Sequence, residues 1–393
     1  MAKIKLPKWL SEVYGKCNRG ETVFRRFRKT IVLEANPSPS YTRTEKQDKV
    51  RKAYAQALRE WYKLSPEERE EWREKGRPLG LPAYQTFMKY RIKELLASIW
   101  IYELTIDNSS NSNTLNDYQV LLRVNNDSDF FSTVQDRKFM EFYDSDKETL
   151  LNHYVELWDD VNYNARIWIK IPEIPANGVK KIYLKRNTLR TEDLSNGDKV
   201  FDFFDGFEGT TKMVYGCTSC LTLNPDGTAT LDGGSAHHDV WANYQINGNV
   251  VAEMKAKINF DNPTTSLIGI SLVKESENKG YEALLDERDT VEDLQLRVDA
   301  SANQIFAKGS KIGALDISKW YLLKLIYITD GTFSFKVYEY DNYALFDEAE
   351  GTETTYSTPF NIGMHIYNKA LVDFIRIRKY TSPMPTVSYS KIS

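Results

Sequence analysis

Aromatic residues beside polar ones in the C-terminal half have the types and spacing for ligand recognition. Trp241 and Tyr244 follow Asp239 closely, and Tyr281 and Tyr338 lie further along the chain. An exposed aromatic ring can stack on a sugar ring while a neighbouring carboxylate accepts hydrogen bonds from its hydroxyls. The candidate ligand-binding residues are therefore Trp241, Tyr244, Tyr281 and Asp239. The competing interpretation is that these aromatic residues fill a core or pair across strands.

Cysteine and histidine residues could bind a metal, but their spacing is not that of a zinc site. The chain has three cysteines, and two of them form the C-x-x-C segment "CTSC" of Cys217 and Cys220. No second Cys or His pair follows at zinc spacing, so ordinary strand or turn cysteines are the preferred interpretation. A local disulfide or a metal ligand is the alternative. The segment "HHD" (237–239) could also bind a metal, but the start of a polar strand is preferred.

Catalytic signatures are absent from the sequence. There is no G-x-S-x-G segment and no glycine-rich phosphate loop. A glycanase would need two carboxylates on one face of a strand, as a Glu-x-Asp-x-Glu segment supplies. The acidic segments 284–294 and 346–353 fall in expected loops. We therefore expect no enzyme, and a glycan-active enzyme is the alternative.

Charge is distributed unevenly along the chain. Residues 1–97 contain 23 Lys and Arg against 12 Asp and Glu, and the remainder contains 29 against 43. A basic cluster, interleaved with Phe24 and Phe27, is formed by Arg25, Arg26, Arg28 and Lys29. Such a cluster suits phosphate and base contacts, so nucleic-acid binding is one interpretation. Docking onto an acidic protein surface is preferred, because Glu residues alternate with the basic residues in the helices that follow.

The first 97 residues predict a small α+β unit. Segment 20–35 is typical of a β-hairpin, and segment 43–64 carries Val50, Tyr54, Leu58 and Trp61 on one helical face. Ser65 and Glu68 predict a capping box at the start of the next helix, which Gly76 ends. A third helix is expected over about 82–97.

Beyond residue 97 the spacing of hydrophobic residues changes from a helical period to the two-residue period that is typical of β-strands. Six alternating segments lie between residues 100 and 186, and segments 250–258 and 333–340 alternate in the same way. The sequence therefore predicts a multidomain, mainly β chain. We expect a helical module over 1–97, a β-sandwich spacer over 98–200 and a second sandwich over 201–393. No apolar run is long enough to span a membrane, and the first residues lack a signal peptide, so synthesis in a cytoplasm is expected.

Three stretches resemble known families. Residues 64–90, "LSPEEREEWREKGRPLGLPAYQTFMKY", together with 13–32 and 36–54, resemble a small module of phage and prophage structural proteins. Residues 101–124, 140–160 and 165–185 resemble a β domain of uncharacterised function found in archaeal and thermophile surface or viral proteins. In that family the segment "NGDKVFDFFDGFEG" (196–209) begins a concanavalin A-like, laminin G-like jelly roll. Residues 372–390 resemble the last strand and tail of such proteins.

These resemblances imply a non-enzymatic virion structural protein of a phage or archaeal virus. Residues 1–97 would anchor it to other virion proteins of the capsid or tail, and the jelly roll would bind a host-surface glycan or a protein. It would be made in the host cytoplasm, located in the virion and homo-oligomeric, with no membrane contact. Nucleic-acid binding is the alternative. Many such jelly rolls hold a structural Ca²⁺, for which the resemblance implies Glu208 and Asp373 as side-chain ligands.

Overall fold

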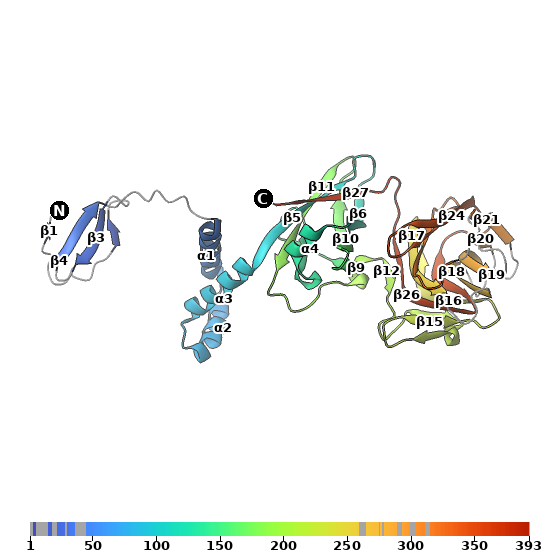
Figure 1. The fold of residues 1–393 in the computed structure, drawn as a ribbon, viewed down its shortest axis with the longest axis horizontal. Coiled ribbons are helices and arrows are strands. Elements are labelled where there is room, and N and C mark those ends of the chain that lie inside the picture. Colours follow the sequence, from blue (N-terminus) through green and yellow to red (C-terminus); the bar gives the residue numbers. More distant parts are fainter. Residues whose placement is uncertain are drawn as a thin grey trace. The chain divides into compact units, whose positions relative to one another are not determined.

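The chain divides into two compact units, Met1–Leu96 and Ala97–Ser393 (Figure 1). The computed structural model describes residues 3–4, 15–17, 22–27, 30–35, 45–258, 265–274, 276, 279–288, 293–298, 304–310 and 315–392. Among these residues, no helix has both the length and the apolar character that crossing a membrane requires.

The first unit begins with an antiparallel sheet in the strand order β1-β4-β3-β2. Its strands are β1 (Lys3–Ile4), β2 (Gly15–Cys17), β3 (Thr22–Phe27) and β4 (Thr30–Ala35). The hairpin expected over residues 20–35 is confirmed, because β3 pairs with β4 from Thr22↔Ala35 to Phe27↔Thr30.

Three helices follow, with the expected boundaries. They are α1 (Glu45–Lys63), α2 (Pro66–Gly76) and α3 (Ala83–Ala97), with the short 3-10 helix η3 (Arg77–Leu79) after α2. The predicted capping box is confirmed. The Ser65 backbone N–H donates to Glu68 Oε2 over 2.7 Å, and the Glu68 N–H donates to Ser65 Oγ over 3.2 Å. These bonds satisfy two donors at the start of α2 that would otherwise lack partners.

A small core joins the helices. Its buried residues are Ala57, Phe87 and Met88, with Leu58, Trp61, Leu64, Trp72, Tyr84, Ile92 and Leu95 packed against them. Val50 and Tyr54, which the sequence places on the same apolar face of α1, are 47% and 48% exposed. Only the C-terminal half of that face is therefore buried.

The second unit opens with a sandwich of two antiparallel sheets, here called the middle β domain. One sheet has the order β27-β5-β11-β7-β8 and the other β6-β10-β9. Its strands are β5 (Ser98–Asp107), β6 (Leu115–Val124), β7 (Met140–Tyr143), β8 (Leu150–Leu151), β9 (His153–Asp159), β10 (Asn164–Ile174), β11 (Val179–Asn187) and β27 (Thr386–Lys391). The six strands expected between residues 100 and 186 are confirmed. The short helices α4 (Ser128–Val134) and η4 (Arg137–Phe139) were not expected.

The last strand of the chain lies in the middle β domain. β27 pairs with β5 from Thr386↔Asp107 to Lys391↔Tyr102, so the chain returns to complete a sheet that began almost 300 residues earlier. Figure 1 shows this red strand beside β5 and apart from the other C-terminal strands. The spacer expected over residues 98–200 therefore also contains residues 386–391.

Residues 201–385 form the second sandwich, here called the jelly roll. Its eight-stranded sheet contains β12 (Phe203–Asp205), β14 (Leu221–Leu223), β15 (Ala229–Asp232), β17 (Val250–Ile258), β22 (Tyr321–Tyr327), β23 (Thr332–Glu339), β24 (Leu345–Thr352) and β26 (Lys369–Lys379). Its seven-stranded sheet has the order β13-β16-β25-β18-β19-β20-β21. These strands are β13 (Met213–Gly216), β16 (His238–Ile246), β18 (Thr265–Val273), β19 (Gly280–Arg288), β20 (Asp293–Val298), β21 (Gln304–Lys308) and β25 (Phe360–Tyr367). The short helix α5 (Gly197–Val200) leads into this sandwich. The expected jelly-roll class is thus the observed one.

A buried ion-pair network joins the two β domains. Arg376 of β26 contacts Glu156 of β9 and Glu253 of β17, at 2.7 Å in each case. Arg166 of β10 adds a 3.0 Å contact to Glu156, and Arg378 adds a 3.3 Å contact to Glu253. The alternation of β17 is as expected, but Glu253 on its polar face is covered by the neighbouring domain instead of water. Each charge therefore depends on its partners for solvation.

The pKa values of Glu156 and Glu253 show that the arginine charges outweigh the effect of burial. Burial alone raises the pKa of Glu253, but the charges of Arg376 and Arg378 outweigh burial and hold it at about 2. Burial likewise opposes the ionised form of Glu156, and Arg376 and Arg166 lower its pKa below the ordinary value. Both carboxylates are therefore charged at neutral pH.

Two sequence-based expectations about acidic segments are wrong. Segment 346–353 was expected to be a loop, but all except its last residue lies in β24. In segment 284–294, Asp286 lies on β19, is 3% exposed and contacts Arg297 at 3.1 Å. Asp286 therefore lies on a buried strand and not in a solvated turn.

Candidate functional site

The seven-stranded sheet carries its functional candidates on the face that points away from the core. Alternate residues of each strand, such as Val240, Ile270 and Ala283, pack into the core between the sheets. Apart from Trp241 and Leu284, the residues between them that are named here are polar or small, and although they face outward most are deeply set. They are Asp239, Trp241, Gly269, Ser271, Glu282, Gln295, Arg297, Gly363 and His365, and we call them the outer face.

Strand register aligns these residues in two rows across five strands. In one row Trp241 is opposite Gly363, then follow Ser271, Glu282 and Arg297. A side chain at Gly363 would meet Ser271 Oγ at 2.5 Å and Trp241 Cβ at 3.0 Å. The absence of a side chain at Gly363 therefore allows Trp241 and Ser271 to pack closely over this strand.

The second row contains a hydrogen-bonded chain of polar groups. His365 Nδ1 lies 2.9 Å from Asp239 Oδ1, and His365 Nε2 lies 3.0 Å from His237 Nδ1. Because a carboxylate only accepts, Nδ1 of His365 is the donor in the bond to Asp239, and either ring nitrogen can be the donor in the bond between His365 Nε2 and His237. Donor atoms of Asp239, Glu282 and His365 all lie within 4.8 Å of one another. The cluster is therefore a fixed set of donors and acceptors.

A pair of stacked aromatic rings lies beside the polar rows. Tyr215 of β13 and Trp241 of β16 have ring centroids 6.2 Å apart and an interplanar angle of 19°. Tyr215 is 46% exposed and Trp241 is half-buried. Gly216, at φ +75°, brings the chain against Trp241, where a Cβ would lie 2.3 Å from the indole ring. The glycine thus permits an aromatic surface next to Asp239.

The structure separates the residues that the sequence grouped as ligand-binding. Trp241 and Asp239 belong to the outer face. Tyr281 is 2% exposed within the core, where burial raises the pKa of its hydroxyl to about 12 and Tyr356 O accepts its hydrogen bond. Tyr244 lies within the irregularity of β16 between Trp241 and Gln245, and its ring packs on Phe203 with the centroids 5.3 Å apart. Tyr281 and Tyr244 therefore support the sandwich and not the outer face.

The residues expected to bind calcium fit that ion poorly. Asp373 lies on β26, and its Oδ2 accepts a hydrogen bond from Lys255 Nζ over 2.6 Å. The Lys255 ammonium group therefore occupies the position at which a cation would approach the Asp373 carboxylate. Glu208 is an exposed residue after β12. We derive no role for calcium from this pair.

The basic cluster lies in the part of the chain that is described least. Arg25 and Arg26 are on β3, where the structure describes the backbone and not their side chains. Arg28 and Lys29 lie outside the described residues. Nucleic-acid binding and docking by this cluster both stay predictions.

Sequence reasoning missed most of the outer face. Glu282, Ser271, Arg297 and His365 come from different strands, and only strand register unites them. One signal was present in the segment "YEALLDER" (281–288), in which Glu282 and Asp286 flank an apolar run. Successive side chains of a strand point to opposite faces, so Glu282 and Asp286 share one face, and a buried carboxylate needs a polar partner there.

A family described as a domain of unknown function (DUF2341) matches residues 136–231. This range covers the second half of the middle β domain and the first strands of the jelly roll. No curated protein matches the chain.

Solved structures with a similar fold include three sugar-binding or lectin-like proteins. A carbohydrate-binding module (CBM66) from Bacillus subtilis is 14% identical over 46% of this chain and 97% of its own, with a TM-score of 0.33. Peanut lectin with a bound 9-residue peptide is 10% identical over 47% and 97%, with a TM-score of 0.36. A legume lectin-like domain from Entamoeba histolytica is 13% identical over 41% and 87%, with a TM-score of 0.34.

Proposed function

We propose that this protein is a non-enzymatic display protein whose jelly roll binds a carbohydrate on the outer face of the seven-stranded sheet. One observation carries the proposal. The stacked rings of Tyr215 and Trp241 adjoin a polar cluster of Asp239, His365 and Glu282 on the same face of the sheet.

This arrangement matches the chemistry of a sugar. A pyranose has an apolar face of C–H groups, which stacks on Trp241, and a rim of hydroxyls that both donate and accept. The imidazoles of His237 and His365 and the carboxylates of Asp239 and Glu282 together offer donors and acceptors. Because buried polar groups reject a ligand that leaves them unpaired, the cluster would select among sugars by their hydroxyl pattern.

The display role rests on sequence resemblance. Residues 1–97 would attach the protein to a phage or archaeal virus particle, and the two β domains would present the sugar site to the host surface. The buried network of Glu156, Arg376 and Glu253 supports this role, because it would hold the jelly roll firmly against the middle β domain.

The experiment is a glycan-array screen of the full chain, with Trp241→Ala and Tyr62→Ala screened in parallel. Tyr62 is the matched control, since it is 71% exposed on α1 in the other unit. We expect saturable binding to a small set of related glycans, lost in Trp241→Ala and kept in Tyr62→Ala. Absence of binding by the folded wild-type protein would overturn the proposal.

A second candidate function is glycan cleavage at the same site. Donor oxygens of Asp239 and Glu282 lie within 4.8 Å, near the roughly 5 Å that separates the two carboxyl groups of retaining glycosidases. The two carboxylates come from different strands, unlike the single-strand pair that the sequence lacks. Release of reducing ends from the glycans that bind, lost in Glu282→Gln, would favour this function over binding alone.

A further inference from the structure

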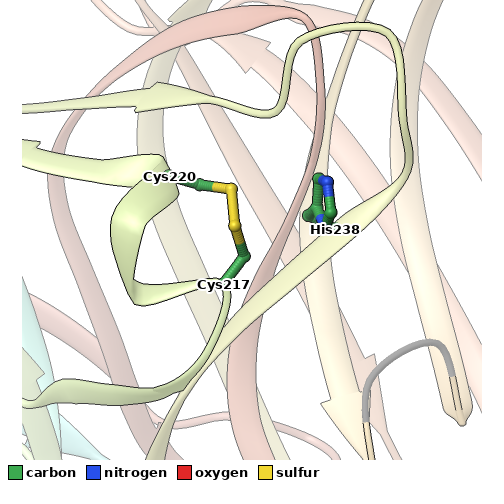
Figure 2. Close-up of side chains that lie close together, drawn as sticks. All are labelled: Cys217, Cys220 and His238. Carbon is green, nitrogen blue, oxygen red and sulfur yellow. A yellow bond between two sulfur atoms is a disulfide. The ribbon is translucent and has the colours of Figure 1, made fainter.

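The two weak metal motifs of the sequence meet in the structure. Cys217 and Cys220 flank and close the 3-10 turn η5 (Thr218–Cys220), and His238 begins β16. Sulfur and nitrogen donors of these three residues all lie within 4.8 Å of one another. Figure 2 shows the imidazole of His238 beside the two sulfur atoms.

The two cysteines are joined by a disulfide, so they are not the ordinary thiols that the sequence favoured. A disulfide across so short a turn is one state of a C-x-x-C pair, and the reduced dithiol is the other. In the disulfide state the backbone of the turn is held by its own hydrogen bonds, because the Cys220 N–H donates to Cys217 O over 2.9 Å and the Cys217 N–H donates to Asp239 O over 3.0 Å.

We propose that reduction converts this disulfide into a divalent metal site formed by Cys217, Cys220 and His238, with Zn²⁺ as the preferred ion. Two thiolates and one imidazole are the donors that zinc takes in proteins, and water completes the tetrahedron. The site goes beyond the proposed sugar function and does not depend on it.

The geometry places the ligands before any metal binds. His238 is fixed in the sheet by its pairing with Ile366, and the Cys217 hydrogen bond ties the turn to the next residue of the same strand. Cys220 is 6% exposed while Cys217 and His238 are half-buried, so an ion has access from one side. Separation of His238 from the cysteines in sequence explains why motif spacing did not reveal the site.

The conversion balances with a dithiol reductant. The reductant transfers two electrons and two protons, the S–S bond breaks, and the reductant leaves as its own disulfide. Metal binding then displaces the two thiol protons into solvent, and each sulfur binds as a thiolate. A small disulfide that accepts the two electrons, and leaves as its dithiol, re-forms the Cys217–Cys220 bond and releases the ion.

The test uses the full chain with Cys17→Ser, so that Cys217 and Cys220 supply every thiol. The protein is titrated with Co²⁺ in the oxidised state and again after reduction with a phosphine that does not bind the metal. We expect one Co²⁺ per reduced chain, with a thiolate-to-cobalt charge-transfer band, and no such band in the oxidised chain. Added Zn²⁺ should remove the band.

Variants locate the site. In the reduced protein His238→Ala should weaken Co²⁺ binding about tenfold or more. Thr218→Ala, an exposed non-ligand in the same turn, should leave binding unchanged. A reduced chain without the band, or a band that His238→Ala does not alter, would overturn the proposal. Loss of the folded circular-dichroism spectrum on reduction would also overturn it, because the disulfide would then be a structural brace.

Discussion

Substitution of Glu156 by Gln should destabilise the second unit more than the loss of an ordinary ion pair does. The network holds Glu156 and Glu253 against Arg166, Arg376 and Arg378, and side-chain exposure is 1% for Glu156 and 0% for Arg376. The Trp168 indole N–H also donates to Glu156 over 2.6 Å. Glu156→Gln keeps the size of the side chain and leaves three guanidinium groups with one carboxylate.

The expected cost follows from burial. An exposed ion pair contributes about 0–1 kcal/mol, whereas removing one partner of a buried pair costs about 3–5 kcal/mol because the other charge is left uncompensated. We therefore expect the free energy of unfolding to fall by about 3 kcal/mol in Glu156→Gln. Urea unfolding followed by tryptophan fluorescence measures this change.

Two controls define the reasoning. Glu173→Gln, an exposed change on β10, should alter the free energy of unfolding by less than about 0.5 kcal/mol. Adding Arg166→Met to Glu156→Gln removes one uncompensated charge and should recover part of the loss. A decrease of less than about 1 kcal/mol in the free energy of unfolding of Glu156→Gln would refute the view that the buried arginines depend on Glu156 as a partner.

Two further predictions concern a helix cap and a buried histidine. Ser65→Ala removes the acceptor for the Glu68 N–H and should cost about 1 kcal/mol, measured by thermal unfolding, whereas exposed Glu71→Gln should cost almost nothing. Burial lowers the pKa of His153 from 6.5 to about 4, so the folded state binds fewer protons than the unfolded state. The stability that depends on a neutral His153 is fully present above pH 6.5. It is lost as the pH falls towards 4, and the free energy of unfolding then decreases by about 3 kcal/mol in total. Urea unfolding across that range should show this slope, and a His153→Gln chain with an unchanged slope would contradict it.

Local pattern was enough to predict most elements of the fold. The capping box at Ser65, the hairpin over 20–35 and the alternation of β17 depend on neighbouring residues, which the sequence displays directly. The pairing of β27 with β5 depends on residues almost 300 positions apart, and no local signal encodes it. The burial of Glu253 could not be predicted from local sequence for the same reason, because a neighbouring domain covers this side chain.

The candidate site was predictable only in part. Trp241 and Asp239 were found by residue type, because an aromatic ring next to a carboxylate suits sugar binding wherever it occurs. His365 and Glu282 join them through strand register, which depends on the order of strands in the sheet. Tyr281 has the same residue type as a ligand-binding aromatic, and only the direction of its side chain into the core distinguishes it.

The affinity of Trp241→Ala for a glycan that the wild-type protein binds tests the central claim most directly. Isothermal titration of the full chain gives the dissociation constant, with Tyr62→Ala as the matched control. Loss of the stacking ring should weaken binding about tenfold or more, which corresponds to about 1.4 kcal/mol. Equal affinity in the wild type, Trp241→Ala and Tyr62→Ala would contradict the assignment of the sugar site to the outer face.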